Sequence, residues 1–452
     1  MRPGAWPSRR CSRSNPTEPA DVTVSAVHEL WGRVTDRVRH ATRGGSRAPA
    51  IAALDIGTEF AKALVVTVER DPEGRLVGVV RGSGRQRQGL SHMQSGTVSD
   101  IDAVVANCRA AMDAARAMAG RRPMAAVIGI AGELVKGATS TMTARRDDAR
   151  QPLTDAELER LVARAQDRAL REAEERIRWE SGLDTLDVRL VHAAIVEMRI
   201  DGYPVSNPIG FTGAQVELHV FNAFAPRVHL GALQSVADAL GLQLLGVIAE
   251  PYAVATCLDP GELGDAGAVF IDIGGGTTDV ALVRGGGISG TKMLALGGRA
   301  FTKGLVERLG TSFAEAERRK LAVTEEPASE VVDTLREDAR IWRDGVELMI
   351  GDLAGGELLP GRVLLCGGGA DLPQVREALE EDGWWERLPF ARRPAIRLLG
   401  PDEVMGLRDA TESLGTRQDV TPMALAHQAL ILDAGASAVD RAMREVVRGM
   451  DL

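Results

Sequence analysis

Cysteine, aromatic residues and long apolar runs are all scarce in this chain of 452 residues. Its four cysteines, Cys11, Cys108, Cys257 and Cys366, stand far apart without the spacing of a metal site, and we expect free thiols in a reducing compartment. An aromatic share of 4% argues against large stacking surfaces. No apolar run reaches the length of a membrane span and no signal-peptide core is present, so a cytoplasmic protein is expected.

An excess of positive charge is also lacking. The formal net charge of −9 disfavours a nucleic-acid-binding protein, because such proteins need a basic surface for the phosphate backbone. An apolar share of 44% with 26% charged residues is typical of a soluble globular protein. The length exceeds what one hydrophobic core usually supports, so two or more domains are expected.

Glycine, in contrast, is abundant and clustered at the ends of predicted strands. Residues 269–273 predict a buried strand and residues 280–283 a second one, with Gly274-Gly-Gly276 in the turn between them. Such a turn brings backbone N–H groups close to an anion. Asp272 precedes the turn, where a carboxylate can hold Mg²⁺ beside a phosphate, and Thr277 adds a hydroxyl. An ordinary hairpin without a ligand is the alternative.

Two further turns have the same character. One strand ends in Asp55-Ile-Gly-Thr58 and continues as another strand after the turn. A later strand ends in Gly367-Gly-Gly369, just before a predicted helix. Neither is a P-loop, because no Gly-Lys-Ser/Thr follows, and neither has the Gly-x-Gly-x-x-Gly spacing of a dinucleotide fold.

Two Asp-x-Gly hairpins and a late Gly-Gly-Gly turn, in this order, resemble the actin, Hsp70 and sugar-kinase ATPase superfamily. The resemblance implies an α/β, ribonuclease H-like fold of two domains that face each other across a cleft holding MgATP. The nucleotide contacts it implies are Gly57, Thr58, Lys62, Gly274, Gly275, Gly276, Thr277, Glu317, Lys320, Gly367, Gly368 and Gly369. It also implies that Asp55 and Asp272 hold a hydrated Mg²⁺.

Catalysis, if present, is expected to depend on a water oriented by Glu250 or Asp272. Slow turnover or nucleotide switching without hydrolysis fits as well, because a loop that binds phosphate does not by itself hydrolyse it. Glu250 could instead be a helix-start carboxylate stabilised by the helix dipole. Glu317 and Lys320, which the resemblance places beside the nucleoside, could instead form a surface ion pair.

An insertion over 132–228 distinguishes this chain from actin, Hsp70 and the sugar kinases. It predicts a helix that starts with a capping box at Thr154 and Glu157, followed by strands over 188–200 and 215–225. This helix-plus-hairpin unit resembles the small SHS2 subdomain of the cell-division protein FtsA and the pilus-assembly protein PilM. The run 199–213 is close to the FtsA pattern.

The resemblance is closer to FtsA than to PilM, although features of both occur. The 269–279 loop and Gly406-Leu-Arg-Asp409 are more like FtsA. The position of Lys62 and the short segment 321–366, much of which suits one helix over 330–349, are more like PilM. The domains expected on this basis are a basic, partly disordered N-terminal extension with an amphipathic helix (1–49), the first part of domain I (50–131), the SHS2-like insertion (132–228), a return to domain I (229–260), domain II with a reduced outer subdomain (261–432) and a C-terminal helix or tail (433–452).

The N-terminal extension carries nine Arg and four acidic residues within residues 1–50 of an otherwise acidic protein. A basic amphipathic helix from about Asp21, with Trp31 on its apolar face, could lie on an anionic membrane surface. It could equally dock on its own domain or on a partner. The tail after 436 can form a short helix, but it lacks aromatics.

Three functions follow as hypotheses. The first is an FtsA-like, membrane-associated protein of bacterial cell division that tethers an FtsZ-type cytoskeletal polymer to the plasma membrane, with self-association possible. The second is a PilM-like cytoplasmic ATP-binding scaffold of type IV pilus assembly that holds the tail of a membrane-protein partner. The third, a small-molecule kinase, is disfavoured because the insertion leaves no obvious substrate-binding domain.

Overall fold

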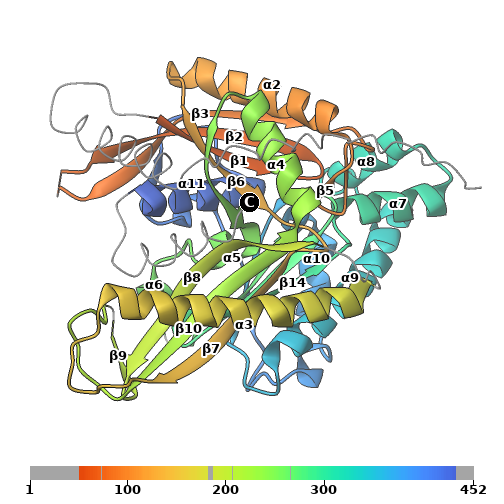
Figure 1. Ribbon diagram of the computed structural model, residues 1–452. Coiled ribbons are helices and arrows are strands. Elements are labelled where there is room, and N and C mark those ends of the chain that lie inside the picture. The colour runs from red at the N-terminus through yellow and green to blue at the C-terminus, as the bar shows by residue number, and fades with distance from the viewer. Residues whose placement is uncertain (1–49, 73, 182–186, 206, 265, 434–452) are drawn as a thin grey trace, which may run out of the picture. The chain divides into compact units, whose positions relative to one another are not determined.

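The computed structural model describes residues 50–72, 74–181, 187–205, 207–264 and 266–433 (Figure 1). The predicted N-terminal helix, Cys11 and the predicted tail helix beyond Asp433 lie outside the described residues. Within the described ranges, no helix is both long enough and apolar enough to cross a membrane.

The first sheet is built around β1, whose neighbours extend it in both directions. Its strand order is β11 (Gln243–Ala249), β6 (Ala125–Ile130), β1 (Ala50–Ile56), β2 (Phe60–Arg70), β3 (Leu76–Arg87) and β17 (Leu407–Asp409). β1 runs parallel to β6 and antiparallel to β2. Almost every residue of β1 and β6 is buried, which explains why these strands are continuous apolar runs in the sequence.

Helices from four parts of the chain pack with this sheet in one apolar cluster. They are α2 (Ile101–Ala119), α4 (Arg227–Ala239), α5 (Glu250–Ala255) and α11 (Val420–Asp433). Asp100 caps α2, since its side chain accepts a hydrogen bond from the N–H of Ala103. The predicted second domain extended to 432, but β17 pairs with β3 and α11 packs against β1, so the last part of the described chain returns to the first sheet.

The second sheet contains nine strands. Their order is β16 (Ala395–Leu398), β15 (Arg362–Cys366), β12 (Ala268–Ile273), β13 (Thr278–Arg284), β14 (Gly287–Leu294), β7 (Lys136–Arg145), β10 (Gln215–Pro226), β8 (Val188–Ile200) and β9 (Tyr203–Pro204). Residues of β12 alternate between two cores: Val269 and Ile271 face the helices of the second half, and Phe270 faces the cluster shared with the first sheet.

The outer face of the second sheet is covered by α7 (Gly298–Leu309), α8 (Phe313–Leu321), α9 (Ser329–Ala354) and α10 (Pro373–Glu380). Trp342 of α9 is buried there and its indole N–H donates to Thr278 Oγ1 at 2.9 Å. Between α8 and β15 the described chain forms α9 as its sole helix, and no strand, in agreement with the single long helix predicted for this short segment.

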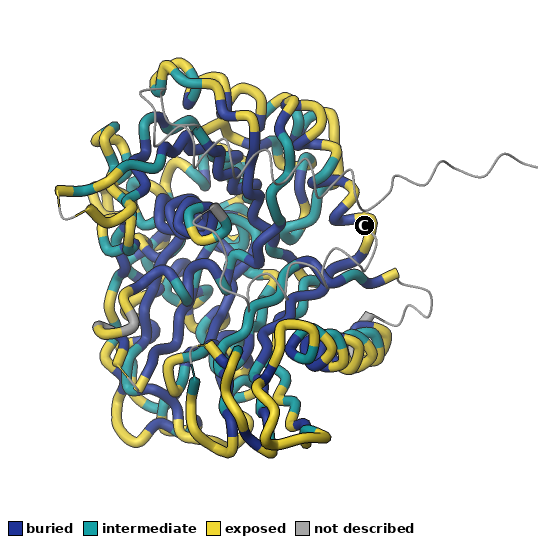
Figure 2. Tube along the Cα trace, turned by 60° about the vertical axis from the view of Figure 1, so that its left-hand side comes forward, coloured by how far each residue is buried: buried dark blue, intermediate teal, exposed yellow. Residues whose placement is uncertain are grey.

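The remaining described elements are short. They are β4 (Met93–Gln94) paired with β5 (Thr97–Val98), α6 (Pro260–Leu263) and the 3-10 helices η1 (Gly368–Asp371), η2 (Trp385–Arg387), η3 (Pro401–Glu403) and η4 (Arg417–Asp419). Buried positions follow the strands, while exposed positions lie in loops and on the outer sides of helices (Figure 2).

The insertion has its own core beneath α3 (Asp155–Ser181), which crosses β7, β10 and β8 (Figure 1). Thr154 Oγ1 accepts a hydrogen bond from the N–H of Glu157, as the capping box predicts. The helix and the strands β8 and β10 agree with the prediction, but β7 was not predicted. Within the second sheet, β7 connects the insertion's strands to β14, because Ala138 pairs with Gly290 of β14.

An aromatic contact joins the insertion to α5. The rings of Phe221 and Tyr252 stack with their centroids 4.9 Å apart, and the ring of His192 meets Tyr252 edge-on at 4.4 Å. Burial lowers the pKa of His192 to about 4, so the imidazole is neutral at physiological pH. The insertion therefore contacts the helix whose first residue is Glu250.

Helix α2 lies directly on the backbone of β3. A Cβ atom at Gly84 would stand 1.9 Å from the carbonyl oxygen of Ala111, and one at Gly82 would stand 2.0 Å from that of Ala115. Real side chains do not approach backbone so closely, so only glycine permits this packing. The polar residues 81–87 therefore belong to β3, and Gly82 and Gly84 within them leave the space that α2 occupies.

We expect Gly84→Ala to lower the free energy of unfolding by about 1–3 kcal/mol, since α2 must move away from β3. The matched control is Gly231→Ala in α4, where an added Cβ meets no atom within 4 Å. That change should stabilise the protein slightly, by up to about 1 kcal/mol, because alanine favours a helix. Urea unfolding of both variants checks the difference, and equal midpoints would contradict the close packing.

Candidate functional site

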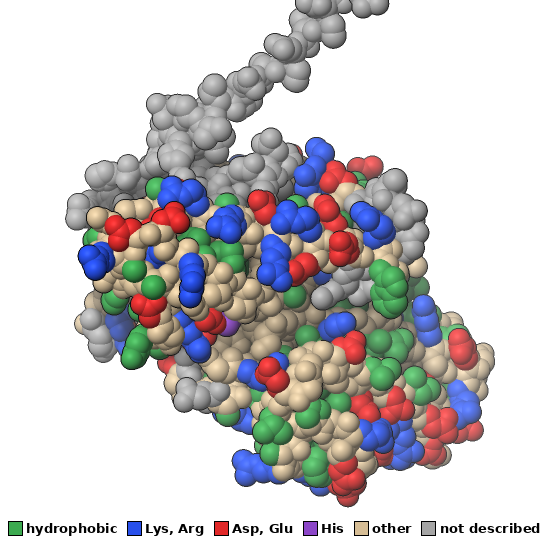
Figure 3. Space-filling model, turned by 60° about the horizontal axis from the view of Figure 1, so that its bottom comes forward, with side chains coloured by type: hydrophobic (Ala, Val, Ile, Leu, Met, Phe, Trp, Pro, Cys, Tyr) green, Lys and Arg blue, Asp and Glu red, His purple; other side chains and the backbone are tan. Residues whose placement is uncertain are grey.

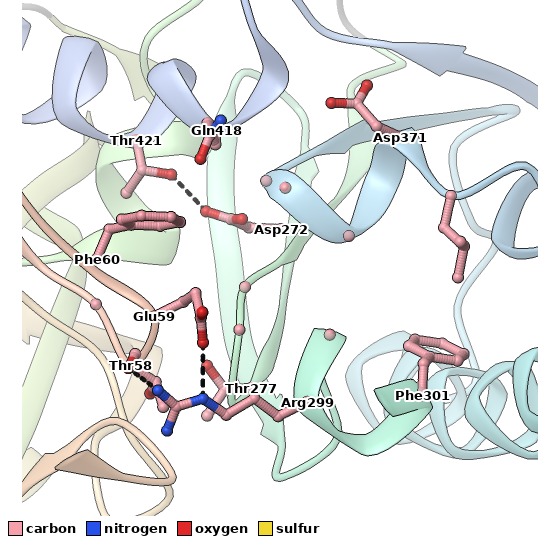
Figure 4. A pocket seen from close by; sticks show the side chains of 18 of the residues that line it. Thr58, Glu59, Phe60, Asp272, Thr277, Arg299, Phe301, Asp371, Gln418 and Thr421 are labelled. Atoms are coloured by element: carbon pink, nitrogen blue, oxygen red, sulfur yellow. Dashed lines mark hydrogen bonds and ion pairs between the residues drawn. The ribbon is translucent and has the colours of Figure 1, made fainter. Parts of the chain in front are cut away.

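A cavity of about 450 Å³ lies between the turns of the two sheets (Figure 4). Of the site residues predicted from the sequence, the structure places all but one in its lining: Asp55, Gly57, Thr58, Lys62, Glu250, Asp272, Gly274, Gly275, Thr277, Glu317, Lys320, Gly367, Gly368 and Gly369. Gly276 is the exception, because it faces the other turn: a Cβ there would meet Thr58 Oγ1 at 2.7 Å.

The first turn joins β1 to β2 and is closed by a hydrogen bond of 3.0 Å from the N–H of Gly57 to the carbonyl oxygen of Phe60. The antiparallel register places Asp55 opposite Lys62. Lys62 Nζ donates to Asp55 Oδ2 at 2.8 Å and to the carbonyl oxygen of Gln418 at 2.7 Å. One ammonium group therefore ties the first hairpin to the segment that precedes α11.

Lys62 is charged despite its burial. Burial opposes the ammonium form, but Asp55, and to a smaller extent Asp272 and Asp419, outweigh this effect and raise the pKa of Lys62 above its ordinary value. The sequence resemblance implied that Lys62 contacts the nucleotide. In the structure its first role is to neutralise carboxylates on the cavity wall.

The second turn joins β12 to β13 and rests on the start of α7. The N–H of Gly274 donates to the carbonyl oxygen of Thr277 at 2.9 Å. The N–H of Gly298 donates to the carbonyl oxygen of Gly274 at 2.9 Å, and the N–H of Arg299 donates to that of Gly275 at 2.7 Å. The turn is thus fixed by helix α7, which supports a rigid wall for a ligand.

Three carboxyl groups at this turn carry raised pKa values. Burial, reinforced by Asp272, raises the pKa of Asp279 to about 8. Burial also raises the pKa of Asp272, against the hydrogen bond that Thr421 Oγ1 donates to its Oδ2 at 2.5 Å. The pKa of Glu250 lies well above its ordinary value because of burial and the nearby Asp55, Asp279 and Asp272. Carboxyl groups are therefore in excess of cationic groups here.

This excess fits a hydrated divalent cation. Across the described residues, no three His, Cys, Asp or Glu side chains converge closely enough to hold a metal ion by themselves. Mg²⁺ commonly uses one or two carboxylates together with waters and phosphate oxygens, so a fuller protein cage is unnecessary. The residues that fit this role are Asp272 and Asp55. Because Lys62 binds Asp55 Oδ2, Asp55 would use its other carboxylate oxygen.

The third turn comes close to Asp272. Gly367 has a φ of +80°, and a Cβ there would lie 2.2 Å from Asp272 Oδ1. At Gly369 a Cβ would lie 2.3 Å from the side chain of Ile273. The glycines thus let the β15–η1 connection pass the second turn without filling the cavity.

Glu317 and Lys320 form an ion pair of 2.8 Å, but it is not a surface pair, because their side chains are only 12% and 11% exposed. Lys320 Nζ donates to the carbonyl oxygen of Gly298 and to Thr302 Oγ1, both at 2.8 Å. The pair joins α8 to α7 at the cavity wall. Contact with a nucleoside remains a prediction.

Sequence reasoning missed several lining residues. Arg299 and Glu59 form an ion pair at 2.8 Å across the cavity edge, and Thr421 binds Asp272 (Figure 4). Asp279, the last residue of the Gly-Gly-Gly-Thr-Thr-Asp run, points inward beside Thr277. Gly129 makes room for the predicted Glu250, because a Cβ at Gly129 would lie 2.4 Å from Glu250 Oε1.

Comparisons with known proteins agree with this geometry. The family described as cell division protein FtsA matches residues 269–411. Cell division protein FtsA of Neisseria meningitidis serogroup B is 28% identical over 271 residues, which cover 60% of this chain and 60% of that protein. Cell division protein FtsA of Streptococcus pneumoniae serotype 2 is 28% identical over 354 residues, covering 73% and 72%. The chain therefore spans less than two thirds of the Neisseria protein.

Among solved structures, a chain of the PilM-PilN type IV pilus biogenesis complex matches with a TM-score of 0.59 at 18% sequence identity. The match covers 84% of this chain and 98% of that chain. With two α/β halves around a cleft lined by hairpin turns, the protein has the two-domain actin-like fold. Within that class its sequence is similar to cell division protein FtsA, and its fold is similar to that of a chain in the PilM-PilN complex.

We expect Lys62→Met to lower the free energy of unfolding by about 3 kcal/mol at neutral pH, because buried carboxylates lose their cation. The loss should be larger near pH 8 than near pH 5.5. The sign follows from the raised pKa values of Asp272 and Asp279: the folded state keeps protons that the unfolded state releases, so stability falls as pH rises toward about 8.

Urea unfolding in EDTA without nucleotide measures this effect at both pH values. Lys292→Met is the control, because Lys292 pairs with the largely exposed Asp352 at 3.2 Å. It should cost no more than about 1 kcal/mol at either pH. A deficit for Lys62→Met that is the same at both pH values would contradict the role assigned to the ammonium group.

Proposed function

We propose that this protein binds MgATP and acts in bacterial cell division, where it tethers an FtsZ-type polymer to the inner face of the plasma membrane. The observation that carries the proposal is the FtsA match over 269–411, which includes the second turn and the third turn of the cavity. The similar FtsA proteins are cell division proteins by name. Self-association and a membrane-protein tail as a further partner belong to the same proposal.

The chain's own residues suit the phosphates of ATP. Gly57, Thr58 and the turn over 274–277 offer backbone N–H groups and hydroxyls at the cavity, where they would cradle phosphate oxygens. Asp55 and Asp272 would hold the hydrated Mg²⁺, which neutralises phosphate charge when bound. The third turn with Glu317 and Lys320 would border the adenosine.

ATP hydrolysis is slow or absent in this proposal. Burial, together with the nearby Asp55, Asp279 and Asp272, raises the pKa of Glu250 well above its ordinary value. This favours the protonated form of its carboxyl group, which cannot accept a proton from water. Asp272 is held by Thr421 at 2.5 Å, which fixes the orientation of its carboxylate. If hydrolysis occurs, Glu250 or Asp272 would orient the attacking water. Nucleotide switching without hydrolysis would require neither residue.

A PilM-like scaffold of type IV pilus assembly is the second candidate. The likeness to a chain of the PilM-PilN complex over 84% of this chain favours it, as does the single helix α9 between α8 and β15. A scaffold of this kind would use the insertion to hold the cytoplasmic tail of a partner.

Thermal unfolding with and without MgATP tests the site. At a ligand concentration of about 100 times Kd, binding stabilises the folded protein by about 2.7 kcal/mol, which raises Tm by several degrees. Asp272→Asn should lose the part of this shift that depends on Mg²⁺. The control is Asp338→Asn, a half-buried carboxyl outside the cavity whose pKa is raised to about 6 by burial and Glu337. A Mg²⁺-dependent shift that survives in Asp272→Asn would contradict the metal assignment.

Vesicle flotation tests the tether. The full chain, a chain starting at Ala48, FtsZ filaments and vesicles containing phosphatidylglycerol are combined with MgATP. We expect the filaments to float with the full chain and not with the shortened one, because the N-terminal segment carries nine of the arginines. Filaments that float with neither chain would overturn the tether and favour the pilus scaffold.

A further inference from the structure

The guanidinium group of Arg299 connects the two halves of the cavity. Arg299 stands in the first turn of α7, beside the second turn, and its Nε donates to Glu59 Oε2 at 2.8 Å. A terminal nitrogen donates to the carbonyl oxygen of Thr58 at 2.8 Å, and the side chain is only 12% exposed. Figure 4 shows both bonds at the edge of the cavity.

The same residue also holds the second turn. Its backbone N–H donates to the carbonyl oxygen of Gly275 at 2.7 Å. A Cβ at Gly275 would lie 2.7 Å from the Cβ of Glu59, so the two turns touch at this point. Arg299 thus binds one turn through its backbone and the other through its side chain.

The opposite side of the cavity is held in a different way. There Thr421 binds Asp272, and α5 and α11 share one apolar cluster with both sheets. In Figure 4 the Thr421–Asp272 contact lies above the Arg299–Glu59 contact. The apolar side resists separation, whereas the Arg299 side is held by hydrogen bonds to charged groups, which water can replace.

Arg87, which binds Glu59, makes a second and weaker contact across the cavity, to Glu317. Arg87 Nε donates to Glu59 Oε1 at 2.7 Å, and its terminal nitrogen lies 4.0 Å from Glu317 Oε1. The side chain of Arg87 is 54% exposed, so solvent screens this contact. Arg299 binds both Glu59 and Thr58 and is little exposed, so it is the stronger of the two contacts across the cavity.

We propose that Arg299 is a positioning residue that clasps the phosphate turns together and thereby sets how long a nucleotide stays bound. This inference rests on the proposed nucleotide site. A phosphate chain cradled between two touching turns can enter or leave only when the turns separate, and separation breaks the bonds of Arg299 to Thr58 and Glu59. The apolar contact around α5 and α11 serves as the hinge side.

The test is the dissociation rate of a fluorescent ATP analogue with Mg²⁺ from the full chain. Arg299→Ala should release it about tenfold faster, a coupling typical of linked sites. Arg299→Lys should give an intermediate rate, because an ammonium group keeps the charge but cannot bind Glu59 and Thr58 in a fork. Arg343→Ala is the matched control: Arg343 pairs with Glu381 at 2.7 Å and is 13% exposed, but both lie outside the cavity.

Hydrogen exchange without nucleotide gives a second readout. In Arg299→Ala the amides of 57–60 and 274–278 should exchange faster, while those of β12 and β15 should not change. Faster exchange throughout both strands would indicate loss of folding and overturn the specific role. Release at the wild-type rate from Arg299→Ala would also overturn the clasp and leave the proposed function standing.

A wild-type chain that binds no MgATP would overturn the proposed function instead. The clasp would then be decided by hydrogen exchange alone, and unchanged exchange at both turns would overturn it. Faster exchange confined to the two turns would support a clasp between them.

Discussion

The cleft depends on the placement of one ammonium group among carboxylates. Lys62 sits opposite Asp55 because the β1–β2 hairpin fixes their register, and it reaches the carbonyl oxygen of Gln418 on the segment before α11. Without this cation, acidic groups from three separate parts of the chain would repel one another in a poorly solvated space. With it, the first hairpin, the second turn and the start of α11 can share one cavity wall, and negative charge remains for a divalent cation.

Much of the fold could be predicted because its buried strands end in glycine-rich turns. The apolar runs before Gly57, Gly274 and Gly367 predicted three buried strands, and the capping box at Thr154 predicted the start of α3. β7 was harder to predict, because most of its residues are small or polar rather than apolar. Its partner strand, β10, also lies about 80 residues further along the chain. The return of α11 to the first sheet was also missed, because a helix that is apolar on nearly all sides does not reveal which sheet it covers.

The site was predicted where chemistry is local in sequence and missed where it is assembled from distant segments. Asp272 and the glycines after it stand in one motif, so the sequence shows them together. Arg299 contacts Thr58 across about 240 positions of chain, and Thr421 contacts Asp272 across about 150. Neither partner is marked by its own neighbours in the sequence. The burial of Glu317 and Lys320 could not be predicted either. An i,i+3 charge pair has the same sequence whether solvent or a neighbouring helix surrounds it.

The bridge between Ala138 and Gly290 has a consequence for any attempt to reduce this protein to its cleft. β14 has β13 on one side, and on the other side its neighbour is the insertion's strand β7. Removing 132–228 would leave β14 as an open sheet edge with unpaired N–H and C=O groups, which is a template for intermolecular strand pairing. A minimal version would therefore aggregate through that edge unless β14 were given a lysine or a proline in place of its lost neighbour.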